Sequence, residues 1–163
     1  MSAERQNVVL VYPVSSDRGR ILMQFSKDPE DPSYNRFNGL SAWPRQREGL
    51  SEAAHRALRS AGIDGATLQF RGTIHWSRFD PDDWPLFGHL FLAHIPKGAG
   101  IVMEGEMTRR EWIEVSDLFS DQAPCWPGDL NTLPLVLDED PRPIHGLMMY
   151  DNGVPVEWRF ERT

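Results

Sequence analysis

The chain has 163 residues, 40% of them hydrophobic, and a formal net charge of −7 at pH 7. This length suits a single domain over 1–163 with a real core, and the negative charge argues against binding of a nucleic acid polymer, which depends on many Lys and Arg contacts. The single cysteine, Cys125, excludes an internal disulfide and fits a reducing compartment, the cytoplasm; we expect no signal peptide and no membrane association, because no apolar run approaches the roughly 18 residues of a membrane span.

The first part of the chain predicts two strands and a loop. Residues 8–14 form a β-branched run typical of a buried strand, and turn residues at 15–19 lead into a second strand at 21–25. Residues 27–35 contain two prolines and three acids, which predicts a loop.

Residues 50–61 carry the clearest helical pattern. Apolar side chains recur along one stripe, three or four residues apart, at Leu50, Ala53, Ala54, Ala57, Leu58 and Ala61. Gly62 is placed to end the helix in the left-handed conformation, and either Gly49 or Ser51 can cap its start. We therefore expect a surface helix that packs on a sheet.

The second half predicts mostly strands. Strands are expected at 67–76, 86–95 and 111–115, with a turn at 80–83 between the first two. A capped helical turn is expected at 116–119 and a short helix at 132–137. Residues 146–150 and 154–160 predict a hairpin closed by Asn152-Gly153.

The segment from Asn38 to Ile63 reads NGLSAWPRQREGLSEAAHRALRSAGI. It resembles the Nudix box, a pattern of Gly, five residues, Glu, seven residues, Arg-Glu, an aliphatic residue, any residue, Glu-Glu, any residue, Gly and an aliphatic residue. The matching positions are Glu48, Arg56, Leu58, Gly62 and Ile63.

Several positions depart from the box. Ala42 replaces the opening glycine, Ala57 replaces the glutamate after arginine, and Ser60, with a one-residue deletion, replaces the Glu-Glu pair. The family uses those glutamates to hold divalent cations, since carboxylates three and four residues apart on a helix share one side of it. The retained motif therefore predicts the fold more directly than the activity.

A second resemblance lies near the end of the chain. Trp126-Pro127-Gly128-Asp129, Pro134-Leu135-Val136-Leu137 and His145-Gly146 resemble animal-type oxidised-purine nucleoside triphosphate diphosphatases, which are MutT-like Nudix hydrolases. Asn38-Gly39 and Glu106-Met107 match the same family, so the resemblance covers nearly the whole chain in order. It implies an α/β Nudix fold, with a mixed β-sheet sandwiched between helices.

The resemblance also implies roles in purine recognition. Trp126 would stack on a purine, Asn38 and Asp129 would hydrogen-bond the edge of the base, and Trp76 would form an aromatic wall of the pocket. Gly128 stands where the family has the first of two consecutive acids, which weakens the case for oxidised guanine as the ligand. From the residues alone, Trp126 can equally pack in the core, Asn38 can serve a turn, and Asp129 can cap the short helix.

The catalytic and metal-binding roles fall on the few acids that remain. Glu48 and Glu106, helped by Glu52, would form at most a weak Mg²⁺ site, with Glu48, Glu106 and Arg56 as catalytic residues. Without the glutamate that Arg56 normally orients, it would pair with Glu48 or Glu52, or bind phosphate directly. Glu48 and Glu106 can also be ordinary solvated acids.

Two further arginines precede the helix. Arg45 and Arg47 can bind phosphate as bidentate donors without a metal, or can be ordinary surface charges. The leading hypothesis is a divergent Nudix hydrolase that cleaves a pyrophosphate linkage of a purine nucleotide or a related phosphate. The alternative is a Nudix-fold module that has lost hydrolysis and binds a purine nucleotide or a protein partner. Cleavage of another bond, such as a glycosidic one, also remains open.

Overall fold

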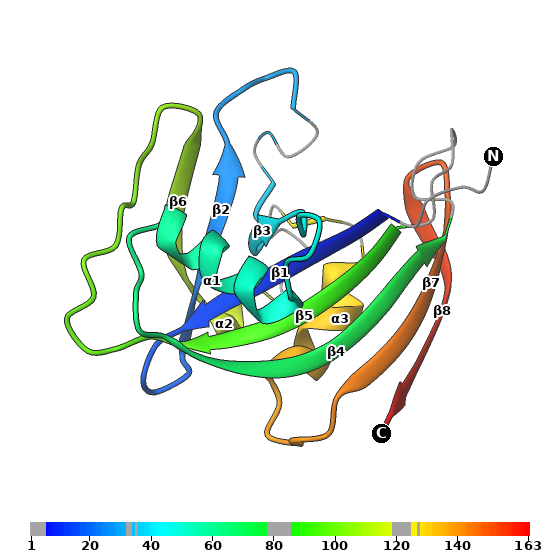
Figure 1. Ribbon diagram of the computed structural model, residues 1–163. Coiled ribbons are helices and arrows are strands. Elements are labelled where there is room, and N and C mark those ends of the chain that lie inside the picture. Colours follow the sequence, from blue (N-terminus) through cyan, green and yellow to red (C-terminus); the bar gives the residue numbers. More distant parts are fainter. Residues whose placement is uncertain (1–5, 32–33, 35, 78–85, 119–124, 127) are drawn as a thin grey trace.

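The computed structural model describes residues 6–31, 34, 36–77, 86–118, 125–126 and 128–163 (Figure 1). Within these residues one eight-stranded mixed sheet has the order β6-β2-β1-β5-β4-β7-β8, with β3 beside β1. The strands are β1 (Gln6–Val14), β2 (Arg20–Ser26), β3 (Leu40–Ala42), β4 (Thr67–Ser77), β5 (Leu86–His94), β6 (Thr108–Glu114), β7 (Ile144–Asp151) and β8 (Val154–Arg162). The helices are α1 (Leu50–Ser60), α2 (Val115–Leu118) and α3 (Asp129–Leu137).

The predicted elements are present, with differences in their bounds. The short strand β3 was not expected, α3 begins at Asp129 rather than Thr132, and β6 begins at Thr108 and ends before Val115, which belongs to α2. Strand β2 pairs with β1 at Val14 and Ile21 and with β6 along its whole length. The predicted turn at 80–83 lies outside the described residues. No helix of the described part is long and apolar enough to cross a membrane.

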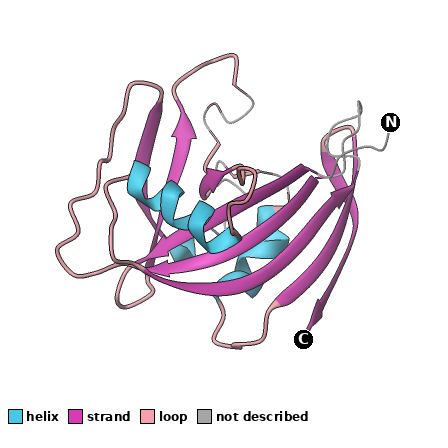
Figure 2. Ribbon diagram, in the orientation of Figure 1, coloured by secondary structure: helices cyan, strands magenta, loops and turns pink. Residues whose placement is uncertain are grey.

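The central strand β1 divides the interior into two cores. Its even-numbered residues, such as Leu10 and Tyr12, pack on the side of α3, while Val9 and Val11 pack on the side of α1. Figure 2 shows the helices on the two faces of the curved sheet. The predicted mixed sheet between helices is confirmed.

Helix α1 ends as the sequence predicted. Gly62 has φ +77°, its N–H donates to Arg59 O at 2.9 Å, and the N–H of Ile63 donates to Leu58 O at 3.0 Å. These two bonds form the left-handed cap that satisfies the last carbonyls of a helix. At the other end Gly49 is the N-cap and makes no side-chain capping bond, so the Ser51 alternative is wrong.

Helix α3 is held in place by a fully buried arginine. Arg71, in β4, donates to Val136 O at 2.8 Å, to Leu135 O at 3.1 Å and to the Asp138 carboxylate at 3.2 Å. Arg162 of β8 also bonds to Leu135 O and to Asp138. Because the last carbonyls of a helix have no partner within it, these guanidinium groups satisfy them and fix α3 against the sheet. The first residue of α3 reaches the site described below.

Candidate functional site

A cavity of about 330 Å³ opens between the α3 face of the sheet and the segment that leads into α1. Its walls come from β1, β4, β5, β7, α3 and the segments around residues 38–43 and 126. The lining residues are Val8, Leu10, Asp31, Asn38, Ser41, Trp43, Trp76, Leu86, Trp126, Asp129 and Tyr150. The fold thus brings four sequence-predicted residues (Asn38, Trp76, Trp126 and Asp129) to one place. Their role in binding stays a prediction.

Trp76 forms one aromatic wall because the neighbouring strand leaves room for it. Its ring lies across Gly88 of β5, where a Cβ atom would fall 2.2 Å from Trp76 Cη2. No side chain can occupy that space while the indole keeps its place. The glycine in the middle of a strand is therefore explained by close packing of an aromatic ring over the backbone.

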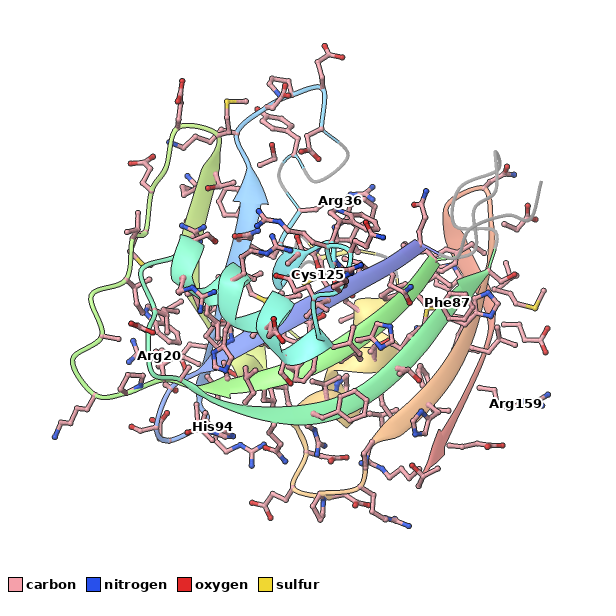
Figure 3. The ribbon with its side chains drawn as sticks, viewed as in Figure 1. Arg20, Arg36, Phe87, His94, Cys125 and Arg159 are labelled. Carbon is pink, nitrogen blue, oxygen red and sulfur yellow. The ribbon has the colours of Figure 1, made fainter. Side chains whose placement is uncertain are left out.

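Trp126 forms a second aromatic wall. The segment that carries it lies beside Phe37, through a bridge between Phe37 and Cys125, and Figure 3 shows Arg36 and Cys125 close together above the sheet. The Arg36 guanidinium carbon lies 4.9 Å from the centroid of the Trp126 ring, within the range of a cation–π contact. One wall of the cavity thus has a cation at its rim.

The carboxyl of Asp129, which lines the cavity, has a strongly raised pKa. Removal from water raises the pKa of its carboxyl from 3.8 to about 7, against a backbone hydrogen bond at Trp126 that lowers it. Burial, and after it the negative charge of Asp129, raise the pKa of the nearby Cys125 thiol to about 11. Near neutral pH, Asp129 is therefore partly protonated and can donate as well as accept a hydrogen bond.

The N-terminus of α3 also shows why an acid of the family pattern is missing. Gly128 is the N-cap residue and has φ +101°, and a Cβ there would lie 2.6 Å from Met148 Sδ and 2.8 Å from Tyr150 Oη. A side chain at this position would be strained in its backbone and would collide with its neighbours. Because Gly128 occupies the N-cap, the alternative that Asp129 caps α3 is wrong.

Asn38 joins this cavity to a second one. The backbone of Asn38 exchanges two hydrogen bonds of 2.8 Å with Gln24 of β2, and its Oδ1 accepts the N–H of Gly39 at 2.9 Å. A neighbouring cavity of about 210 Å³ shares Asp31, Asn38 and Ser41, and it is also lined by Met107 and Thr108. The backbone of Asn38 is therefore fixed beside β2 by an antiparallel bridge rather than in a turn, and the residue lines both cavities.

Glu48 and Arg56 form a bidentate ion pair at the start of α1. Arg56 Nε donates to Glu48 Oε2 and Arg56 Nη2 donates to Oε1, both at 2.9 Å. The N–H of Arg45 donates to Oε1 at 3.0 Å, and Arg56 Nη2 also donates to the carbonyl of Trp43 at 2.8 Å. Hydrogen bonds from Arg56, then from the Arg45 backbone, lower the pKa of Glu48 to about 2. Of the predicted partners of Arg56, Glu48 is the one found.

The predicted magnesium ligands do not converge. Glu52 lies in the first turn of α1 with its carboxylate over Gly49, where a Cβ would be 3.4 Å from Oε1, and Glu106 is exposed ahead of β6. In the described part of the chain, no group of three His, Cys, Asp or Glu side chains is placed to hold a metal ion. Mg²⁺ needs several oxygen ligands in near-octahedral geometry, and these three carboxylates do not supply such a set by themselves. The assignment of Glu48, Glu52 and Glu106 as metal ligands stays a prediction.

The two arginines of the loop before α1 are exposed. Arg45 and Arg47 lie within the turn that ends at Glu48, where the N–H of Glu48 donates to Arg45 O at 3.0 Å. Arg47 has φ +66°, a left-handed conformation that only a tight turn imposes on such a residue. Trp43, at the other end of the loop, lines the cavity, so the loop connects the cavity to the start of α1.

Sequence reasoning missed several residues of the site. Val8, Leu10 and Leu86 follow from the side-chain alternation of β1 and β5, but nothing in the sequence shows which face of those strands carries a cavity. Trp43 and Tyr150 carried a signal, since one follows the box entry and the other ends a predicted strand. Their inward orientation depends on packing.

The chain superposes over 96% of its length on the mutator MutT protein of Bacillus halodurans, covering 97% of that protein, with a TM-score of 0.77 and 16% identity. It also superposes on the Nudix domain of Shewanella oneidensis NrtR complexed with ADP-ribose, with a TM-score of 0.64 and 12% identity over 81% of this chain and 86% of that one. The dihydroneopterin triphosphate pyrophosphohydrolase of Escherichia coli gives a TM-score of 0.54 and 18% identity over 72% of this chain and 86% of that one. No family model matches the sequence, and no curated protein matches it. The chain has the Nudix fold.

Proposed function

We propose that this Nudix-fold chain binds a purine nucleotide, or a closely related nucleoside phosphate, without metal-dependent cleavage of the pyrophosphate linkage. The observation that carries the proposal is the meeting of Asn38, Trp76, Trp126 and Asp129 in one cavity. They come from three separate segments of the chain, since Trp126 directly precedes α3 and Asp129 begins it. Two large aromatic walls with a few polar groups between them are typical of sites for a flat heteroaromatic ring.

The polar groups suit the edge of a purine. A partly protonated Asp129 can donate to a carbonyl oxygen or ring nitrogen of the base and accept from an amino group. The side-chain amide of Asn38, which also lines the cavity, offers the same pair of functions. The ADP-ribose bound by the NrtR Nudix domain supports a nucleotide as the class of ligand for this fold.

The phosphates would extend past Trp43 toward the loop before α1. Arg45 and Arg47 lie in that loop and are exposed, and a guanidinium group pairs with phosphate oxygens through two parallel hydrogen bonds. These arginines would supply part of the charge neutralisation that a divalent cation supplies in the MutT-like family. Nucleotide binding should therefore survive the removal of divalent cations.

The rival function is hydrolysis of the pyrophosphate linkage. It is favoured by the retention of Glu48 and Arg56 as an ion pair next to the cavity, where Arg56 donates to the carbonyl of Trp43. Against it, the carboxylate oxygens of Glu48 are already engaged by Arg56 and by the backbone of Arg45.

Calorimetric titration with GTP, dGTP, ATP and CTP, each in Mg²⁺ and in EDTA, tests both functions when the products are analysed afterwards. We expect a purine nucleotide to bind with equal affinity in the two buffers and to be recovered intact. Trp126→Ala should abolish binding, while the matched control Trp158→Ala, an exposed tryptophan outside the cavity, should retain it. Turnover in Mg²⁺ that Glu48→Gln removes would establish hydrolysis instead. Absence of binding by every nucleotide would reject the proposal.

A further inference from the structure

The last strand, β8, forms one edge of the sheet and carries exposed apolar side chains. Val154, Val156 and Trp158 are 55%, 60% and 48% exposed. Figure 1 shows β8 at the end of the strand order, with β7 on its inner side. A long edge strand with apolar side chains is a template for pairing with another strand.

The backbone of β8 has hydrogen-bonding groups that face outward at known positions. The ladder between β7 and β8 runs in register from Ile144–Arg162 to Met149–Glu157, and the N–H of Thr163 donates to Pro143 O at 3.1 Å. Backbone groups in an antiparallel ladder alternate between the two sides of a strand. The odd-numbered residues therefore bond to β7, and the groups of Trp158 and Phe160 face away from it.

Apart from Arg162, which bonds to Leu135 O and Asp138, the side chains of β8 from Glu157 onward separate by charge between its two faces. Trp158 and Phe160 lie opposite Met148 and Gly146, on the face that also carries α3. Glu157, Arg159 and Glu161 lie on the other face, and Figure 3 shows Arg159 at the outer side of the sheet. A partner strand must therefore match an alternating pattern of apolar and charged residues.

A second copy of β8 matches this pattern in one register. When two antiparallel copies are centred on Trp158, each Glu157 lies opposite Arg159 of the other copy, and the two Trp158 side chains lie opposite each other. Val156 falls at the shift in register between β7 and β8 and is not counted among the pairs. Opposite charges and apolar pairs directly across a ladder stabilise it. Moving the centre to residue 157 or 159 places Glu157 opposite itself or Arg159 opposite itself, which destabilises the pairing.

We propose that this chain forms a homodimer through antiparallel pairing of β8 with β8 of a second copy, centred on Trp158. The two sheets then join into one across a two-fold axis, as expected for an interface in which the same surface meets itself. The paired segment lies outside the cavity between α3 and the sheet, so dimer formation does not depend on nucleotide binding.

Sedimentation equilibrium of the full chain over a range of protein concentrations tests the proposal. The wild type should fit a monomer–dimer equilibrium. Glu157→Arg and Arg159→Glu should each raise the dimer dissociation constant by about tenfold, because each places like charges opposite one another twice in the dimer. The double variant, with both charges exchanged, should return the constant to near the wild-type value.

Glu161→Arg is the matched control, since Glu161 lies on the same face of β8 but opposite Pro155 in this register. It should leave the dissociation constant nearly unchanged. A wild type that stays monomeric at every concentration would overturn the proposal. So would a dimer that neither single charge reversal weakens, or one that the double exchange fails to restore; unchanged circular dichroism of each variant verifies that it folds.

Discussion

Each carboxylate oxygen of Glu48 accepts a hydrogen bond of 2.9 Å from the guanidinium group of Arg56. In the Nudix box pattern an arginine at this position has a glutamate directly after it, and here that residue is the alanine Ala57. The retained glutamate and the retained arginine of the motif thus form an ion pair with each other. Two residues that suggest catalysis in the sequence form a structural link between the box loop and α1.

This ion pair predicts a pH-dependent contribution to stability. A carboxyl whose pKa is lower in the folded than in the unfolded chain stabilises the fold above its ordinary value of 4.5, and the contribution is lost as the pH falls toward the folded value of about 2. The unfolding midpoint of Glu48→Gln should lie below that of the wild type at neutral pH, and the gap should narrow below pH 4.5. Thermal unfolding followed by circular dichroism across this range measures it; a gap that does not vary with pH contradicts the ion pair.

The raised pKa of Asp129 predicts that stability depends on pH in the opposite direction. Its pKa is raised to about 7 from 3.8, so the folded chain loses stability as the pH rises between these values, when the partly buried carboxyl must give up its proton. Asp129→Asn should be the more stable protein above pH 7 and should differ little from the wild type below pH 4. The gain is expected to be up to about 2 kcal/mol, less than the full shift implies, because the residue is partly exposed.

The same substitution, Asp129→Asn, tests whether the protonated form of the carboxyl is the one that binds the nucleotide. If the protonated group donates to the base, the affinity of the wild type for a purine nucleotide falls as the pH rises through 7, whereas Asp129→Asn keeps a donor and binds independently of pH. Titration calorimetry at a series of pH values compares the two. Parallel pH profiles for both proteins would remove Asp129 from base recognition.

Gly128→Ala should destabilise the fold and close part of the cavity. A Cβ at this position would meet Met148 Sδ at 2.6 Å, and the backbone has φ +101°. We expect a loss of about 2–3 kcal/mol in denaturant unfolding, from strain and overpacking together. Gly153→Ala is the matched control, because Gly153 has φ +77° but nothing within 4 Å of a Cβ, so it should lose only about 1 kcal/mol. Equal losses in the two variants would show that packing at Gly128 is unimportant.

Arg71→Met should weaken the attachment of α3. The substitution removes a fully buried guanidinium group and leaves the carbonyls of Leu135 and Val136 without those donors. A loss of about 3 kcal/mol in the free energy of unfolding is expected, together with weaker nucleotide binding through displacement of Asp129. Arg142→Ala, which removes an exposed ion pair with Asp140, should change neither quantity noticeably. Denaturant titration and calorimetry provide the two readouts.

Restoring one family acid should not restore hydrolysis. Ala57 is only 4% exposed and packs in the core beneath α1, so Ala57→Glu buries a carboxylate without a partner and should cost about 2–4 kcal/mol. Ser60→Glu, on the exposed side of the same helix, should be tolerated. Neither variant should release phosphate or pyrophosphate from a nucleotide in Mg²⁺, as measured by chromatography. High activity from Ala57→Glu alone would contradict this description of the box helix.

The sequence by itself determined most elements, because they depend on local patterns, and the resemblance of two segments to the Nudix family implied the fold class. The apolar stripe over 50–61 gave α1, Gly62 ended it, and Asn152-Gly153, at φ +50° and +77°, closed the last hairpin. Only the tertiary structure decided what the polar residues do. The pairing of Glu48 with Arg56, the lack of room for a side chain at Gly128 and the burial of Arg71 depend on contacts between separate segments of the chain. Periodicity along the chain does not encode such contacts, because they are set by how faces of separate elements pack.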